Sequence, residues 1–178
     1  MWVLITGCMF AGKSSELLTR LRRDSVAGKK CVLVCHESDR RYTESNEVVT
    51  HNGTRMQAVR ARRLEGVMDA LKDADTIGID EGQFFPDIHL LAELEASKHI
   101  VVAALLHQFT GKPFPLIESS LSMWDDIVYL HAVCWKCKCY TASRTVRLTP
   151  VSGSMVGGAE AYAAACKQCF NEHTLGMG

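Results

Sequence analysis

Short apolar runs rich in valine and isoleucine alternate with amphipathic segments from the first residue to about residue 133. This alternation is the pattern of a parallel sheet with helices on its faces. Strands are predicted at residues 2–6, 31–35, 76–80, 100–106 and 127–133. The expected fold class is therefore α/β.

Between the predicted strands, apolar residues recur at helical spacing. The three sets, each on one helical face, are Leu17, Leu18 and Leu21, then Leu64, Val67, Met68 and Leu71, then Ile88, Leu91 and Leu94. Each set gives a helix an apolar face that it can bury against the sheet.

Two stretches depart from this alternation. Residues 36–59 are polar and contain Asp39, Arg40 and Arg41, which predicts a mobile surface segment beside the active site. From Cys134 onward the composition changes to cysteines, glycines and other small residues. We therefore expect two domains, a main α/β domain over residues 1–133 and a small module over residues 134–178.

The composition supports one ordinary domain with a small appended module, since 47% of the 178 residues are hydrophobic. Twenty basic residues balance twenty acidic ones, so the overall charge favours a small-molecule partner over nucleic acid or a membrane surface. No apolar run reaches the roughly 18 residues of a membrane span, and the N-terminus reads directly as a strand. A cytoplasmic protein is expected.

The first predicted strand runs into a complete P-loop pattern. Its residues are Gly7, Cys8, Met9, Phe10, Ala11, Gly12, Lys13 and Ser14. In such a loop, backbone N–H groups and the positive end of the following helix surround the β- and γ-phosphates of a nucleotide. Lys13 adds a positive charge, and the Ser14 hydroxyl can ligate magnesium. An ordinary glycine-rich turn is the alternative, which the full pattern between a strand and a helix disfavours.

A second nucleotide-binding element is predicted where an apolar strand ends in carboxylates, as a Walker B element does. Asp80 can act on magnesium, directly or through water, and Glu81 is a candidate general base. Gly82 permits the chain to turn, so that Glu81 can lie across a cleft from Lys13. The alternatives are that Asp80 caps a turn, and that Glu81 is a solvated acid or positions water in an ATPase.

Five of the eight cysteines lie between residues 134 and 169. Four of them form two Cys-x-x-Cys pairs that can close a tetrahedral, structural zinc site, namely Cys134, Cys137, Cys166 and Cys169. The 28 residues between the pairs exceed the about 15–20 of a compact zinc ribbon, so zinc should tie off the base of a long loop. Cys139 could replace Cys137 as a ligand, although the paired spacing favours Cys137.

These features occur together in the class II thymidine kinases, and the chain resembles that family over nearly its whole length. The matching segments are residues 7–18, 39–42, 79–87, 112–114 and 156–159, with Tyr162. The resemblance implies phosphorylation of thymidine at its 5′-hydroxyl, with ATP as donor, catalytic Mg²⁺ and structural Zn²⁺, in nucleotide salvage for DNA synthesis. Deoxyuridine stays open as a second acceptor. A homotetramer and feedback inhibition by dTTP are also implied, without a nucleic-acid or membrane partner.

The same resemblance implies roles for individual residues. Glu81 is the general base, assisted by Lys13 on the phosphates. Contacts to the nucleotide or its metal fall on Asp39, Arg40, Arg41, Asp80, Glu81, Gly82 and Gln83. The thymine pocket falls on Met9, Phe84, Leu105, Phe109, Phe114, Thr145 and Tyr162. A lasso loop that hydrogen-bonds the base through its main chain is formed by Gly153, Ser154, Met155, Val156 and Gly157.

The chain differs from the family pattern at Leu106 and His107, since the family usually has Asp after Ala-Ala-Leu. His107 could be a nucleotide contact or a histidine at the surface. The competing hypothesis is a P-loop ATPase whose zinc module binds nucleic acid, which requires clustered basic residues between the cysteine pairs. Basic residues lie near the start of that segment, but residues 152–165 are mostly small and neutral. A regulatory GTPase is disfavoured because no Asn-Lys-x-Asp motif is present.

Overall fold

The computed structural model describes residues 1–38, 47–49, 55–149 and 160–175. The strands of its main sheet are β1 (Trp2–Gly7), β2 (Cys31–His36), β3 (Glu47–Val49), β4 (Arg55–Ala61), β5 (Thr76–Asp80), β6 (His99–Ala103) and β7 (Asp126–Leu130). They are arranged in the order β3-β4-β2-β5-β6-β1-β7. β3 is antiparallel to β4, and the other six strands run parallel.

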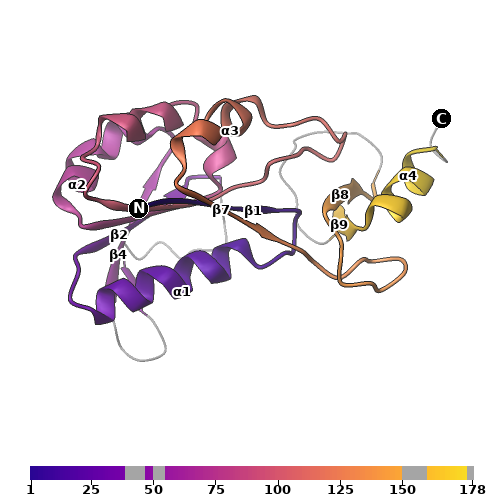
Figure 1. Cartoon of the computed structure of the whole chain (residues 1–178), viewed down its shortest axis with the longest axis horizontal. Coiled ribbons are helices and arrows are strands. Elements are labelled where there is room, and N and C mark those ends of the chain that lie inside the picture. The colour runs from indigo at the N-terminus through magenta and orange to yellow at the C-terminus, as the bar shows by residue number, and fades with distance from the viewer. Residues whose placement is uncertain (39–46, 50–54, 150–159, 176–178) are drawn as a thin grey trace.

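Helical segments cover both faces of this sheet (Figure 1). One face carries α1 (Lys13–Val26), which packs against β1, β5 and β6. The other segments are η1 (Leu64–Val67), α2 (Met68–Asp73), η2 (Gly82–Phe84), η3 (Ile88–Glu93), α3 (Pro115–Ser119) and η4 (Leu121–Met123). The predicted α/β fold, a parallel sheet flanked by helices, is confirmed. No helix in the described residues is long and apolar enough to cross a membrane.

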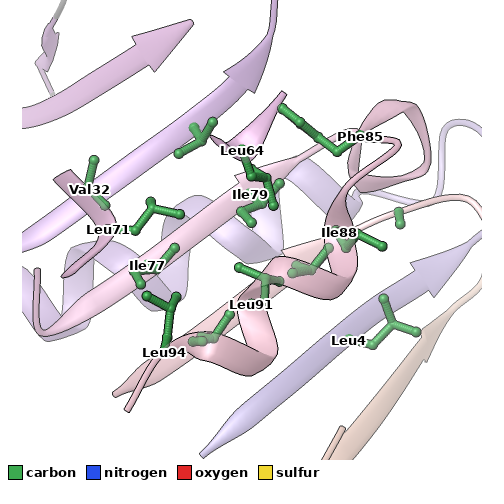
Figure 2. Close-up of a cluster of buried hydrophobic side chains, with 14 of the residues drawn as sticks. Leu4, Val32, Leu64, Leu71, Ile77, Ile79, Phe85, Ile88, Leu91 and Leu94 are labelled. Carbon is green, nitrogen blue, oxygen red and sulfur yellow. The ribbon is translucent and has the colours of Figure 1, made fainter. Parts of the chain in front are cut away.

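The core lies on both faces of the sheet, because successive side chains of a strand point to opposite sides. Ile77 and Ile79 of β5 belong to the cluster that α2 and η3 cover, as Figure 2 shows. Gly78, between them, faces α1. A Cβ at Gly78 would lie 2.4 Å from Cδ1 of Leu21, so the missing side chain is what lets α1 approach the sheet.

All five predicted strands are present, with ends shifted by up to three residues. The strand predicted at 100–106 ends at Ala103, because the chain then leaves the sheet and the Leu105 N–H bonds a side chain. The prediction of a surface segment over residues 36–59 is wrong where β4 pairs in parallel with β2. Among the β4 side chains that the structure describes, the buried ones are the small Ala58 and Ala61, separated by Val59 and Arg60, which gives only a weak strand signal.

A smaller unit follows the main sheet and lies beyond the end of β7 in Figure 1. It contains the antiparallel pair β8 (Arg144–Arg147) and β9 (Tyr162–Ala165), against which α4 (Lys167–Leu175) packs. Its core includes Cys134, Ala142 and Ala165, together with Cys8 of the P-loop. A division into domains at residue 134 remains a prediction, because this core reaches back into the phosphate loop.

Candidate active site

The P-loop is a tight connection from the end of β1 to the start of α1. Gly7 and Gly12 have φ values of +143° and +83°, which favour glycine. A Cβ at Gly7 would also lie 2.2 Å from the carbonyl oxygen of Leu130, so β7 leaves no room for a side chain there. The helix begins at Lys13, as the pattern requires. The backbone therefore has the strand, loop and helix order of a phosphate-binding loop.

One P-loop side chain contacts the end of β5, and a second folds back over the loop. The Ser14 hydroxyl donates a hydrogen bond to Oδ1 of Asp80 over 3.0 Å, and Asp80 is only 2% exposed. The Lys13 ammonium donates to the carbonyl oxygen of Cys8 over 2.8 Å, which folds it back over the loop. A hydroxyl and a carboxylate in contact at this place are the ligand types that hold Mg²⁺ in P-loop proteins.

Glu81 itself makes the turn that was expected of Gly82. Its φ of +57° and ψ of +43° are left-handed, a conformation that costs a non-glycine residue on the order of 1–3 kcal/mol. Gly82 is required for a different reason, since a Cβ there would lie 2.5 Å from Cγ1 of Val102. The turn takes Glu81 out of the strand alternation. The Glu81 N–H donates to Oδ1 of Asp80 over 3.0 Å, so the two acids adjoin.

Gln83 is buried directly behind this turn. It is 5% exposed, and its amide bonds Glu81 on one side and the backbone of Leu105 on the other. The resemblance had implied a contact between Gln83 and the nucleotide. That contact remains a prediction, and the two hydrogen bonds place the side chain between the candidate base and the segment that follows β6.

A small pocket, partly open to solvent, adjoins the P-loop through Met9. Its lining residues are Met9, Phe84, Leu105, His107, Gln108, Phe109, Phe114, Thr145 and Tyr162. The structure thus brings together all seven described residues that the resemblance assigned to a thymine pocket. It adds His107, for which the sequence left a nucleotide contact or a surface position open, and Gln108, whose only signal in the sequence was its position between Leu105 and Phe109.

The pocket is assembled across the two sheets. The Met9 N–H donates to Oγ1 of Thr145 over 3.1 Å, which joins the P-loop to β8. The rings of Phe109 and Tyr162 lie 6.0 Å apart. The guanidinium of Arg147 lies over both, at 5.6 Å and 5.7 Å from their centroids. Such cation–π contacts contribute about 0.5–2 kcal/mol each and fix the aromatic wall.

His107 is the imidazole in this lining. Burial lowers the pKa of His107, and the positive charge of Arg144 lowers it further, while Glu118 acts in the opposite direction. Low pKa values keep the ring neutral at neutral pH. It can therefore donate through one nitrogen and accept through the other.

The four paired cysteines converge in the smaller unit. The sulfur atoms of Cys134, Cys137, Cys166 and Cys169 all lie within 4.8 Å of one another. The Cys137 and Cys166 sulfurs are 3.7 Å apart, close to the edge of about 3.8 Å that a ZnS₄ tetrahedron with 2.3 Å bonds requires. The donor set therefore fits a closed zinc site.

The local backbone also favours a thiolate at Cys134. Burial opposes ionisation of Cys134, but hydrogen bonds from the backbone N–H groups of Cys166 and Cys137 outweigh it and lower its pKa to about 6. Cys139 lies outside the cluster, and its sulfur instead contacts Oγ1 of Thr141 over 3.3 Å. The geometry therefore selects Cys137, as the paired spacing favoured.

Several residues that the resemblance implicated lie outside the described residues. They are Asp39, Arg40 and Arg41 on one side, and Gly153, Ser154, Met155, Val156 and Gly157 on the other. Their roles remain predictions.

Comparison with known proteins places these features in a family. The thymidine kinase family matches residues 1–170, a range that holds the P-loop, the acidic end of β5 and both cysteine pairs. The chain is 41% identical to a thymidine kinase of variola virus over 170 residues, which cover 94% of each chain. It is 39% identical, with the same coverage, to thymidine kinases of raccoon poxvirus and of vaccinia virus strain Ankara.

Proposed function

Because the chain belongs to the thymidine kinase family, we propose that it transfers the γ-phosphoryl group of ATP to the 5′-hydroxyl of thymidine. The products are ADP and thymidine monophosphate. The observation that carries the proposal is the position of Met9, which is part of the P-loop and also lines the pocket. A nucleoside in the pocket and a triphosphate on the loop therefore meet at one residue.

In this reaction the phosphate half of the site works mainly by positioning and by charge. The N–H groups of residues 7–14 surround the phosphates, and Lys13 neutralises the charge that develops on the transferred group. Ser14 and Asp80 would hold Mg²⁺, which would supply positive charge to the phosphates. Glu81 accepts the proton of the attacking 5′-hydroxyl. Gly82 packs closely against Val102 directly after Glu81. Asp39, Arg40 and Arg41 are proposed as further contacts to the nucleotide.

The nucleoside half works by burial and by main-chain recognition. Apolar and aromatic side chains enclose a pyrimidine ring, while a few polar groups fix its orientation. Main-chain groups of residues 153–157 are proposed to read the edge of the base. Deoxyuridine differs from thymidine by one methyl group, and an apolar wall discriminates such a pair by only about 1–3 kcal/mol. Residues 7–14 and the pocket together can also accommodate dTTP, the proposed feedback inhibitor.

Zinc is proposed as the resident ion of the cysteine cluster, where it is structural because four thiolates leave no open position. The cluster joins the start of the smaller unit to α4, and the pocket residues Thr145 and Tyr162 lie between the two cysteine pairs. Bound zinc therefore holds the base of the segment that supplies these residues. A homotetramer in the cytoplasm is the proposed state of the enzyme in the cell.

The test is product formation by purified, zinc-loaded protein with Mg²⁺, ATP and each common deoxynucleoside in turn. The proposal predicts thymidine monophosphate formed one-for-one with ADP, and slower or no reaction with purine deoxynucleosides. Inert nucleosides together with ATP hydrolysis stimulated by nucleic acid would contradict it.

A further inference from the structure

The side chain of Gln83 connects the acidic end of β5 to the pocket. Its Nε2 donates a hydrogen bond to Oε2 of Glu81 over 2.5 Å. Its Oε1 accepts the N–H of Leu105 over 2.9 Å. Because Gln83 is 5% exposed, water does not compete effectively for either bond. One buried amide therefore spans the distance between the candidate base and a residue that lines the pocket.

The chemistry of the two partners determines which residue can make this connection. An ionised carboxylate only accepts hydrogen bonds, and a backbone N–H only donates them. A side chain between the two must donate at one end and accept at the other. A glutamine amide does both in one orientation. An ionised glutamate offers no donor to Glu81, and an aliphatic side chain offers nothing to either partner.

Both ends of the connection are attached to well-held parts of the structure. Leu105 begins a segment that we call the pocket loop, residues 105–114. This loop is closed on itself by bonds from Phe114 N–H to Leu106 O and from Gln108 N–H to Lys112 O, each over 2.8 Å. At the other end, the close contact between Gly82 and Val102 fixes the start of η2.

Glu81 needs such a support. Its backbone is left-handed at a single residue, so the regular geometry of a strand or a helix does not set the direction of its side chain. A base must be held within a fraction of an ångström of its productive position, and a displacement of about 1 Å can cost on the order of 100-fold in rate. The bond from Gln83 restrains the carboxylate at its reacting end.

We propose that Gln83 is a positioning residue, which orients the Glu81 carboxylate toward the 5′-hydroxyl and ties that orientation to the pocket loop. The inference rests on the proposed function, because it needs Glu81 to be the base. The nucleotide contact that the resemblance implied for Gln83 stays a separate prediction. The same loop then holds the nucleoside and, through Leu105 and Gln83, the group that takes its proton.

The experiment compares Gln83→Met and Gln83→Glu with the native enzyme, using Glu93→Met at an exposed position of η3 as the control. Gln83→Met keeps the length of the side chain but loses both hydrogen bonds. We expect kcat to fall on the order of 10- to 100-fold, with the KM for ATP unchanged. The acid limb of its kcat/KM profile should move to higher pH, because a carboxylate without its donor binds a proton more readily.

Gln83→Glu gives a signature that a merely structural role would not produce. The new side chain can donate to Glu81 only while the pair retains one shared proton. Its kcat should therefore approach the native value at low pH and fall as the pH rises, over a range in which the native enzyme is flat. Equal pH profiles for the native enzyme and both variants, or a kcat within twofold of native for Gln83→Met, would overturn the inference.

Glu81→Gln, measured in parallel, separates this inference from the proposed function. A native rate for Glu81→Gln would show that Glu81 is not the general base, and the inference about Gln83 would then also be wrong. A strongly reduced rate for Glu81→Gln, with native behaviour of both Gln83 variants, would overturn the role of Gln83 and leave the base in place. Thermal unfolding of each variant shows whether a lost rate reflects lost folding.

Discussion

The phosphate half and the nucleoside half of the site are built in different ways. The phosphate half consists of two short contiguous segments at the ends of β1 and β5, two strands with neighbours on both sides in a sheet that has a core on both faces. The nucleoside half collects side chains from the P-loop, η2, the pocket loop, β8 and β9. The first therefore depends on local backbone geometry. The second depends on long-range contacts and on the cysteine cluster.

The largest expected effect comes from removing a cysteine ligand, because structural zinc contributes on the order of 10 kcal/mol to the folding of a small module. Cys166→Ser should lose zinc and thymidine binding while the P-loop still binds ATP. Metal content and calorimetric binding of each substrate check this outcome. Cys139→Ser is the control, since Cys139 lies beside the cluster but outside it. Equal loss of ATP and thymidine binding in Cys166→Ser would show that the two halves are not separable.

A second prediction concerns the step at which the halves cooperate. Glu81→Gln keeps the shape of the side chain and removes the base, so kcat should fall about 10²- to 10⁴-fold. Both substrates should still bind, because neither half has lost its contacts. Steady-state rates and equilibrium binding measure the two effects, with the exposed Glu93→Gln as control. Near-native turnover would show that another group takes the proton.

The sheet that supports the phosphate half can be tested at Gly78. An added Cβ would lie 2.4 Å from Leu21, so Gly78→Ala should push α1 from the sheet and cost about 1–3 kcal/mol of unfolding free energy. Urea unfolding measures the change. Gly66→Ala is the control, because nothing lies within 4 Å of a Cβ at that position. Similar stabilities for the two variants would contradict the packing described for α1.

The smallest predicted effect is a pH dependence of the nucleoside half. Burial, and then the charge of Arg144, lowers the pKa of His107. The ring in the native protein therefore gains a proton only at a more acidic pH than an ordinary histidine does. The contribution of the neutral ring to stability is present above about pH 6.5 and is lost as the pH falls below it. The KM for thymidine should rise only at the more acidic pH at which the native ring gains its proton, and less so in His107→Asn. The KM for ATP serves as the internal control.

The sequence predicted the two halves unequally, for physical reasons. The P-loop is one continuous stretch of sequence, and so is the acidic strand end. Gly7 to Ser14 and Asp80 could therefore be assigned from local spacing. The left-handed turn at Glu81 could not, because the tight contact of Gly82 with Val102 is set by packing. His107 and Gln108 carried no motif of their own. β4 was missed because its small apolar residues give little periodicity, and its pairing with β2 is parallel and non-local.

The central claim is that the two halves meet at Met9 and form one continuous active site. It is tested most directly by a single inhibitor in which the 5′-oxygen of thymidine is joined to adenosine through a chain of phosphates. Because the second half would then bind intramolecularly, this inhibitor should bind at least 100-fold more tightly than thymidine or ATP and compete with both. Affinity no greater than that of either substrate, or competition with only one of them, would contradict a shared site.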